Sequence, residues 1–478
     1  MEAGLPADLP RLRAPEKRPA IGIVHLGLGA FFRAHGAIYI AEAMEKSGGD
    51  WSICGVSLKS PGTRDALAPQ GGAYTAVELA PDGTKPRVIT SVAEVLVAPE
   101  DPAAVLSRLT DPAVKIVSLT VTEKGYCHDP ATGALNPDHP DIRHDLAASL
   151  PASAPGYVVR ALALRRAAGL APFTVLSCDN LPDNGSVVRG VVLDLARRID
   201  PDLADWIAAH GRFPATMVDR IVPATSAEDI EATARLTGYD DRAPVMHEPF
   251  RQWVIQDDFV NDDRPDLAGV GAQLVGDVTP FEHMKLRMLN GTHSALAYLG
   301  YLAGHETIAD CAADPVMAGY VKRLWRAEII PALTPPEGTD LDQHADALFA
   351  RYENPAIRHR TWQIAMDGSQ KLPQRILATL AENHAAGRDS HGLCLAVAGW
   401  MRYVSGVDLD GNAIDVRDPL ADRLRLDGQT GAARVDALLA LREVFPQTVA
   451  ETWRDPIVQA LHQLETKGVR DAIRALPG

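Results

Sequence analysis

The sequence predicts an α/β protein whose N-terminal part is built around a parallel sheet and whose C-terminal part is mostly α-helical. Short apolar strands alternate with amphipathic helices over roughly the first 280 residues, a pattern typical of a parallel sheet with helices on both faces. A Gly-x-Gly turn directly follows the first of these strands. After about Phe281 the pattern becomes helical, with loops between the segments. We therefore expect a dinucleotide-binding domain at 1–280 and an α-helical substrate-binding or catalytic domain at 281–478.

The expected strands are apolar runs rich in β-branched residues. The first is Ile21–Leu26, and a helix-compatible stretch follows it to about Lys46. A second buried strand is expected at Trp51–Leu58. Further strands are expected at 74–79, 86–92, 114–122 and 171–180, the last one after the basic helix "YVVRALALRRAAG".

Composition narrows the class of protein. The 478 residues are 46% hydrophobic and 23% charged, which is ordinary for a globular protein. The formal net charge of -15 argues against nucleic acid as a partner, because a phosphate backbone attracts positive charge. No apolar run is long enough to span a membrane, so we expect no membrane partner.

The five cysteines are scattered without CxxC spacing, which predicts free thiols in a reducing compartment and no bound metal. The first twenty residues lack the apolar core of a secretory signal. We therefore expect a cytoplasmic protein. No coiled-coil pattern argues for a large assembly, so a monomer or a small homo-oligomer is expected.

The turn "HLGLGAFFRAH" has the features of a cofactor-binding turn. Gly27 would allow the tight turn after the strand, and Gly29 would let a pyrophosphate approach the backbone. The first residues of the following helix, Ala30 and Phe31, belong to the same predicted site, and Arg33 could reach a phosphate. The third glycine of the usual fingerprint is missing, because Phe32 stands in its place. A plain strand–helix turn is the alternative.

The end of the second strand bears on the choice between NAD and NADP. An NAD-selective site usually carries Asp or Glu there, to bind the adenosine ribose. This sequence has Lys59 and Ser60 instead, so NADP is not excluded. A solvated lysine at the end of a strand is an equally good explanation.

The segment "HMKLRMLNGTHSALAYLGYL" (His283 to Leu302) is expected to be one helix. With Lys285 at 0°, Asn290 falls at about 140° and His293 at about 80°, so all three lie within one arc. A lysine removed from water loses proton affinity and can act as a general acid or base, while an amide can stabilise a developing alkoxide. Polar residues on one helical face are also common at surfaces or as satisfied core groups.

The pattern Lys285-x4-Asn290-x2-His293 resembles the catalytic motif of the long-chain polyol dehydrogenases, the mannitol dehydrogenase family. The resemblance covers nearly the whole chain from about residue 20. It is carried by the blocks "GLGAFFRAH", "SLTVTEKGYC", "FTVLSCDNLPDNG", "MVDRIVP", "EPFRQWVIQDDFVN", "FEHMKLRMLNGTHSALAYLGYL" and "RHRTWQIAMDGSQKLPQRI".

The resemblance implies a Rossmann-type N-terminal domain, a helical C-terminal domain, NAD as cofactor and catalysis without a metal. It implies Lys285 as general acid/base, Asn180 and Asn290 as an oxyanion hole, and His293 as a substrate-positioning residue. Asn180 could alternatively be a turn residue. Thr122, Glu123 and Asp219 are expected near the cofactor, with a strand-end cap as the alternative for Thr122 and Glu123 and an ion pair with Arg220 as that for Asp219.

The resemblance also implies residues that contact the substrate. Lys371 matches a substrate-contacting lysine, whereas Gln363 stands where mannitol dehydrogenases carry an arginine. Arg358 and Arg360 lie upstream and could bind a carboxylate, although helical arginines are usually solvated.

These departures favour a sugar acid as substrate, with NADH-linked reduction of D-fructuronate to D-mannonate as the expected reaction. A 2-dehydrogenase for mannitol, arabinitol or sorbitol is the first alternative. A non-catalytic nucleotide-binding protein is a remote one.

Overall fold

The computed structural model describes residues 9–129 and 132–477 of the chain. Residues 1–8, which belong to the segment where we expect no secretory signal, lie outside the described residues. The chain divides into two compact units, Met1–Thr279 and Pro280–Gly478, next to the boundary expected from the sequence. Within the described residues, no helix is both long and apolar enough for a membrane span.

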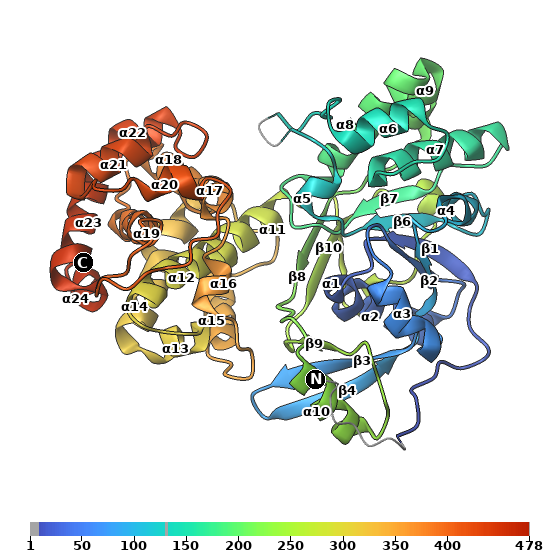
Figure 1. Ribbon diagram of the computed structural model, residues 1–478, viewed down its shortest axis with the longest axis horizontal. Coiled ribbons are helices and arrows are strands. Elements are labelled where there is room, and N and C mark those ends of the chain that lie inside the picture. Colours follow the sequence, from blue (N-terminus) through green and yellow to red (C-terminus); the bar gives the residue numbers. More distant parts are fainter. Residues whose placement is uncertain (1–8, 130–131, 478) are drawn as a thin grey trace. The chain divides into compact units, whose positions relative to one another are not determined.

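The first unit is built on a five-stranded sheet with the strand order β5-β2-β1-β6-β7 (Figure 1). All of its neighbouring strands are parallel, as expected for a Rossmann-type fold. The strands are β1 (Ile21–Leu26), β2 (Ser52–Ser57), β5 (Val92–Val97), β6 (Ile116–Leu119) and β7 (Thr174–Ser177).

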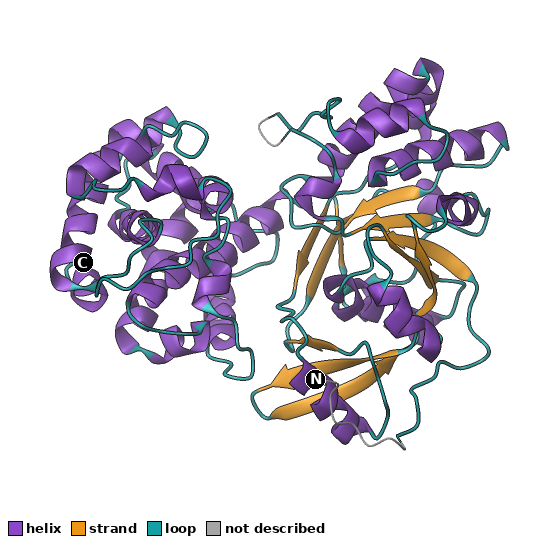
Figure 2. Cartoon of the chain, in the orientation of Figure 1, coloured by secondary structure: helices purple, strands orange, loops and turns teal. Residues whose placement is uncertain are grey.

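Alternate residues of these strands supply two separate cores, one on each face of the sheet. Val24 and Leu26 of β1 belong to one hydrophobic cluster, whereas Ile23 belongs to the other. Helices therefore cover both faces (Figure 2). The helices of this unit are α1 (Ala30–Ala34), α2 (Gly36–Ser47), α3 (Gly62–Leu67), α4 (Pro102–Leu109), α5 (Thr122–Gly125), α6 (Pro140–Ala147), α7 (Ala154–Ala167), α8 (Asn184–Ile199), α9 (Pro201–His210) and α10 (Ala227–Thr237).

Two of the expected strands lie outside the parallel sheet. β3 (Tyr74–Ala80) and β4 (Gly83–Ile89) pair antiparallel, and β9 (Val245–His247) joins them in a second sheet. The reason is the two-residue connection between β3 and β4, which is too short for the crossover that parallel strands need. A third sheet contains β8 (Thr216–Asp219), β10 (Gln252–Gln256) and β11 (Gln273–Val275).

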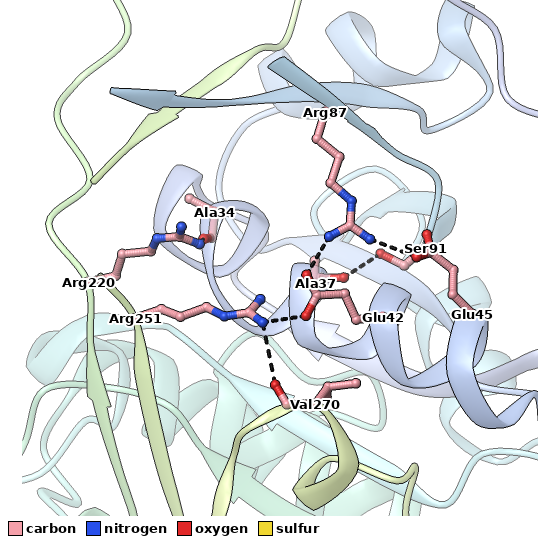
Figure 3. Close-up of polar contacts among 9 residues, drawn as sticks. All are labelled: Ala34, Ala37, Glu42, Glu45, Arg87, Ser91, Arg220, Arg251 and Val270. Carbon is pink, nitrogen blue, oxygen red and sulfur yellow. Dashed lines mark hydrogen bonds and ion pairs between the residues drawn. The ribbon is translucent and has the colours of Figure 1, made fainter. Parts of the chain in front are cut away.

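Helix α2 is held against the second and third sheets by arginines (Figure 3). Arg87 of β4 forms ion pairs with Glu42 and Glu45, and Arg251 also pairs with Glu42. Arg220 donates a 2.7 Å hydrogen bond to the carbonyl of Ala34, at the end of α1. These contacts fix the helices that follow the glycine turn.

Three histidines of this unit are buried and neutral. Burial lowers the pKa of His25, His35 and His247 to about 3 in each case. His25 lies within the parallel sheet, where its ring nitrogens share 2.8 Å hydrogen bonds with Ser118 and Thr120. In the unfolded chain the same side chains titrate near 6.5.

We therefore expect the first unit to lose stability as the pH falls below about 6.5. Between pH 6.5 and 3 the unfolded state binds more protons than the folded state, so the free energy of unfolding rises with pH and falls on acidification. Each buried histidine removes about 1.4 kcal/mol per pH unit, or roughly 4 kcal/mol for the three at pH 5.5. Urea unfolding at pH 7.5, 6.5 and 5.5 measures this.

The matched variants are His25→Gln and His462→Gln, of which the latter changes an exposed residue of the second unit. His25→Gln should reduce the pH slope by about 1.4 kcal/mol per unit, while His462→Gln should keep it. An unfolding free energy that stays constant from pH 7.5 to 5.5 would contradict the expectation.

The second unit is a helical domain organised around buried helices. α12 (Thr292–Leu302) has almost every residue buried, and α19 (His391–Tyr403) is nearly as apolar. A helix buried on all sides lies at the centre of a domain. Gly399 lets the two helices approach closely, since a Cβ there would meet Leu299 at 2.8 Å.

The remaining helices surround this pair. They are α11 (Thr279–Met284), α13 (Ile308–Ala313), α14 (Pro315–Arg323), α15 (Leu341–Tyr352), α16 (Thr361–Ile364), α17 (Gly368–Leu372), α18 (Ala378–Ala385), α20 (Ala421–Arg425), α21 (Gly431–Leu439), α22 (Gln447–Thr452), α23 (Arg454–Lys467) and α24 (Val469–Arg474). Three stretches are π-helical instead of α-helical, namely Lys285–Gly291, Leu324–Ile329 and Pro373–Leu377.

Candidate active site

Four residues predicted to bind ligands follow strands at one edge of the parallel sheet. Gly27 follows β1, Lys59 comes after β2, Thr122 after β6 and Asn180 after β7. Because the strands are parallel, these positions share the carboxyl edge of the sheet. The strand order changes direction between β1 and β6, and such a switch point is where open α/β sheets bind ligands.

The two glycines of the turn have different structural reasons for lacking a side chain. Gly27 has a φ of +93°, and a Cβ there would lie 2.1 Å from the carbonyl oxygen of Thr120. The fold itself therefore requires glycine at this position. Gly29 is exposed and has a φ of -95°, and no atom would come closer than 3.8 Å to its Cβ. Its small size leaves the backbone open to a ligand, as a pyrophosphate needs.

A pair of alanine variants separates these two roles. Gly27→Ala should destabilise the protein by about 3 kcal/mol or more through steric overlap and backbone strain. Gly29→Ala should leave the melting temperature unchanged but weaken NADH binding about tenfold, roughly 1.4 kcal/mol. Differential scanning fluorimetry and fluorescence titration with NADH measure the two effects. Unchanged NADH affinity in Gly29→Ala would contradict a cofactor at this turn.

The structure explains why the third glycine is absent. Phe32 is buried, and its ring stacks on His25 of β1 with 3.4 Å between ring centroids. The close contact that requires a glycine lies one turn later, at Gly36, because a Cβ there would lie 2.6 Å from the Phe32 ring. The helix also breaks at His35, which divides the single predicted helix into α1 and α2.

Arg33 is not placed as a phosphate ligand, and this prediction is corrected. Its side chain is buried, donates a 2.6 Å hydrogen bond to the carbonyl of Ala243 and lies over the ring of Tyr74. The guanidinium therefore ties α1 to the second sheet. Ala30 and Phe31 are half-buried at the start of α1, where Phe31 stacks against His35.

A buried carboxylate organises the segment after β6. Asp179 accepts 2.9 Å hydrogen bonds from the backbone N–H groups of Val121 and Thr122, and one of 2.7 Å from the hydroxyl of Tyr126. Burial raises the pKa of Asp179, although these donors oppose the rise. Thr122 has a φ of +63°, a conformation that costs free energy for a β-branched residue and is therefore held in place by its surroundings.

Asp179 also places its neighbour Asn180, which is exposed at the end of β7. Asn184 supports the same turn by donating from its amide to the carbonyls of Asp179 and Thr216. Lys59 is exposed and its charge reaches the thiol of Cys127. Glu123 is half-buried in α5.

Asp219 ends β8 in the third sheet and is 4% exposed. Its charge acts on the imidazole of His35, beside the glycine-turn helices. Arg220, the ion-pair partner suggested by the sequence, donates to the carbonyls of Ala34 and Glu248.

In the second unit, the predicted catalytic helix contains a π-helical segment. The α-helix expected from His283 to Leu302 holds at His283–Met284, the end of α11, and again from Thr292 onward, because Lys285–Gly291 has π geometry. Hydrogen bonds from i to i+5 bring residues five apart close to one face, whereas α geometry separates them by about 140°. Lys285 and Asn290 are five apart, so the π segment brings them closer to one face than an α-helix would. Such segments are frequent at functional sites.

Specific contacts stabilise this segment. The indole N–H of Trp325 donates to the carbonyl of Met288 at 2.9 Å, and the Tyr352 hydroxyl donates to that of Leu289 at 3.0 Å. These donors satisfy carbonyls at the point where the helix changes geometry. Gly291 lets the π-helical stretch Pro373–Leu377 approach, because a Cβ there would lie 2.7 Å from the carbonyl oxygen of Arg375.

The three residues of the motif are all buried. Lys285 is 9% exposed, Asn290 8% and His293 6%. The amide nitrogen of Asn290 and Nε2 of His293 are buried without a hydrogen-bond partner among the described residues. An unsatisfied buried polar atom is costly, about 1–3 kcal/mol each, so two of them on the helix that carries Lys285 are what a ligand site leaves for its ligand.

The charges around His293 are cationic. Burial is the main cause that lowers its pKa well below 6.5, and the charges of Arg351, Arg375 and Lys285 act in the same direction. His293 is therefore neutral at physiological pH, and can both donate and accept a hydrogen bond through its two ring nitrogens.

The predicted substrate residues fall into two groups. Lys371, in α17, is half-buried and its charge acts on His359. Its ammonium donates to the carbonyls of Ile364 and Met366, at 3.3 and 2.5 Å. Gln363, Arg358 and Arg360 are exposed, and Glu306 lies 3.7 Å from Arg358 and 3.5 Å from Arg360. A carboxylate-binding role for the two arginines stays a prediction.

Sequence reasoning missed Asp179, His359 and Arg375. Asp179 lies beside Asn180 in "SCDN", and the other two lie in the block "RHRTWQIAMDGSQKLPQRI". Their blocks were recognised, but nothing in the spacing indicated that Asp179 is a backbone clamp or that His359 meets His293.

One group of three possible metal ligands, Cys127, His139 and Asp141, occurs among the described residues. Burial, together with Asp141, raises the pKa of the Cys127 thiol to about 12. Nδ1 of His139 already accepts the backbone N–H of Asp141 at 3.2 Å. All five cysteines are free and buried, as expected from their spacing.

Two family models cover most of the chain. The mannitol dehydrogenase Rossmann domain matches residues 21–269, and the mannitol dehydrogenase C-terminal domain matches residues 277–465.

The relatives agree with this division. D-mannonate oxidoreductase of Escherichia coli is 49% identical over 95% of this chain and 95% of that protein. An uncharacterized oxidoreductase of the same organism, YeiQ, is 49% identical over 92% of this chain and 93% of its own length. Among solved structures, Pseudomonas fluorescens mannitol 2-dehydrogenase in a ternary complex with NAD and D-mannitol superimposes with a TM-score of 0.87 at 38% identity, covering 98% of this chain and 96% of that one.

Proposed function

The chain belongs to the mannitol dehydrogenase family, whose members are oxidoreductases that act on secondary alcohols, and we propose that it reduces D-fructuronate to D-mannonate with NADH and catalyses the reverse reaction. D-mannonate oxidoreductase is 49% identical over nearly the full length, which supports this choice. The solved relative carries NAD, which supports NAD as the cofactor.

The residues of the first unit fit such a cofactor. The open backbone at Gly29 and the exposed positions after β2, β6 and β7 lie at the sheet edge where dinucleotides bind. When bound, NADH supplies the hydride that the ketone carbon accepts. The proposed contacts of the cofactor remain Gly27, Gly29, Ala30, Phe31, Lys59, Thr122, Glu123 and Asp219.

The second unit supplies the proton chemistry. Lys285 donates a proton to the ketone oxygen during reduction and takes it from the hydroxyl during oxidation. The unpartnered amide of Asn290 donates a hydrogen bond to that oxygen as negative charge develops there, and Asn180 is the second proposed donor. His293 positions a substrate hydroxyl through its neutral ring.

The observation that carries the choice of a sugar acid is the cationic surrounding of the two imidazoles. Lys285, Arg351 and Arg375 act on His293, and Lys371 acts on His359. A positive local field attracts an anionic substrate even though the whole chain has a net charge of -15. A neutral polyol is not attracted by this positive field.

Steady-state rates with D-fructuronate and D-fructose, each with NADH, test the proposal. We expect kcat/KM to be at least about tenfold higher for fructuronate, roughly 1.4 kcal/mol. KM for the anion should also rise with ionic strength, whereas KM for fructose should not. A preference for fructose would support the second candidate, a polyol 2-dehydrogenase, which the likeness to the mannitol-bound structure favours.

Cofactor choice is tested in the same assay with NADPH. Lys59 stands where an acidic residue would select NAD, and its exposed ammonium could accept a 2′-phosphate. We propose NAD as the preferred cofactor, and a kcat/KM with NADPH equal to or above that with NADH would overturn this.

A further inference from the structure

We infer that His359 is a further substrate-binding residue, which receives a substrate hydroxyl next to the one held by His293. The inference rests on the proposed function, because it assumes a polyhydroxy substrate beside Lys285. It concerns a residue that the sequence motif does not contain.

The first observation is an unsatisfied nitrogen. Nδ1 of His359 is buried and has no hydrogen-bond partner among the described residues, as is true of Nε2 of His293. Each such atom costs about 1–3 kcal/mol unless something completes it. The two rings are neighbours, with centroids 5.2 Å apart and an edge-to-face angle of 84°. Two neighbouring imidazole rings therefore each carry a buried nitrogen that has no partner among the described residues.

The second observation is that the backbone that carries the ring is fixed by hydrogen bonds. The carbonyl of His359 accepts the N–H of Ile308 at 3.0 Å, and its own N–H donates to the carbonyl of Ile357 at 2.8 Å. Ile308 begins α13, and the next residue, Arg360, forms a β-bridge with Thr307. A side chain on such a fixed backbone needs little ordering when a ligand binds.

The third observation concerns the charge state. Burial and, to a smaller extent, the nearby ammonium of Lys371 together lower the pKa of His359 to about 4. The ring is therefore neutral at physiological pH, so it does not repel the cations around it and can offer a donor and an acceptor. A sugar acid carries hydroxyls on successive carbons, and each hydroxyl can match one of these nitrogens.

The isosteres asparagine and glutamine make a sharp test. The amide of asparagine lies where Nδ1 of histidine lies, whereas that of glutamine extends to the position of Nε2. We expect His359→Ala to raise KM for fructuronate at least about tenfold, roughly 1.4 kcal/mol of lost binding, with a smaller change in kcat. His359→Asn should recover KM to within about threefold of wild type, and His359→Gln should not.

Two further readouts and a control variant exclude other roles. NADH affinity should be unchanged in all variants, and the pH profile of kcat/KM should keep its shape, because a neutral hydrogen-bonding group adds no titration. His462→Ala, at an exposed helical position, is the control and should behave as wild type. If His359→Asn and His359→Gln are equally impaired and both melt earlier, the residue is structural and the inference fails. Wild-type kinetics in His359→Ala would also overturn it.

The wild-type protein provides a measurement that does not depend on a folded variant. With ¹⁵N-labelled histidine, the Nδ1 signal of His359 should shift when D-mannonate is added to the NAD complex. No shift at saturating mannonate would overturn the inference. If the enzyme turns over fructose and not fructuronate, the proposed substrate fails, and the same variants measured with fructose then test His359 separately.

Discussion

Replacing Lys285 by alanine is expected to lower kcat by about 10³-fold while NADH still binds normally. A positioned general acid/base contributes about 10²–10⁴ in rate. Lys285 is 9% exposed, beside the neutral His293 and the unpartnered amide of Asn290, so no side chain of the motif can replace its proton. Steady-state kinetics and a fluorescence titration with NADH measure the two quantities.

Lys285→Arg separates proton transfer from charge. Arginine keeps the positive charge but does not release a proton in the accessible pH range, so this variant should be nearly as slow as Lys285→Ala. Lys322→Ala, at an exposed position of α14, is the matched control and should keep full activity. Turnover by Lys285→Arg near the wild-type rate would show that the residue acts as a charge only.

Replacing Asn290 by alanine is the second large effect, with an expected loss of about 10²–10³ in kcat. The reason is that its amide is proposed to donate to the developing alkoxide. The same amide has no partner among the described residues, so the unfolding free energy should stay constant or rise slightly. Kinetics and urea unfolding on one preparation test both parts.

Asn383 provides the contrast, because its amide is satisfied. It donates to the carbonyl of Glu328 at 2.8 Å and to the Ser390 hydroxyl at 2.7 Å. Asn383→Ala should therefore destabilise the protein by about 1–3 kcal/mol, with near wild-type kcat in the folded fraction. If Asn290→Ala destabilises as much as Asn383→Ala and keeps its rate, Asn290 is structural.

Local patterns identified much of the fold. The β-branched runs at Ile21–Leu26 and Trp51–Leu58 were correctly assigned as parallel strands, because two-sided burial produces continuous apolar stretches. The hairpin of β3 and β4 was not separated from that sheet. Strand pairing is decided by connection length and packing, which apolar content alone does not express.

The candidate site shows the same division. Gly27 was predicted from its place after a strand, because a tight turn demands glycine. The roles of Lys285, Asn290 and His293 came from the resemblance to the family and stay predictions. Arg33 was misjudged, since an arginine after a glycine turn can as well bond a carbonyl from a distant strand.

Residue identities at short, constant spacing were enough to predict the family, the two-part organisation and the motif of Lys285, Asn290 and His293, whose catalytic role stays a prediction. The tertiary structure sets the π geometry of Lys285–Gly291, the hydrogen bonds that Asp179 accepts and the contact between His293 and His359. Each of these depends on atoms from segments far apart in the chain, and whether a buried polar atom has a partner is defined only once those segments have packed.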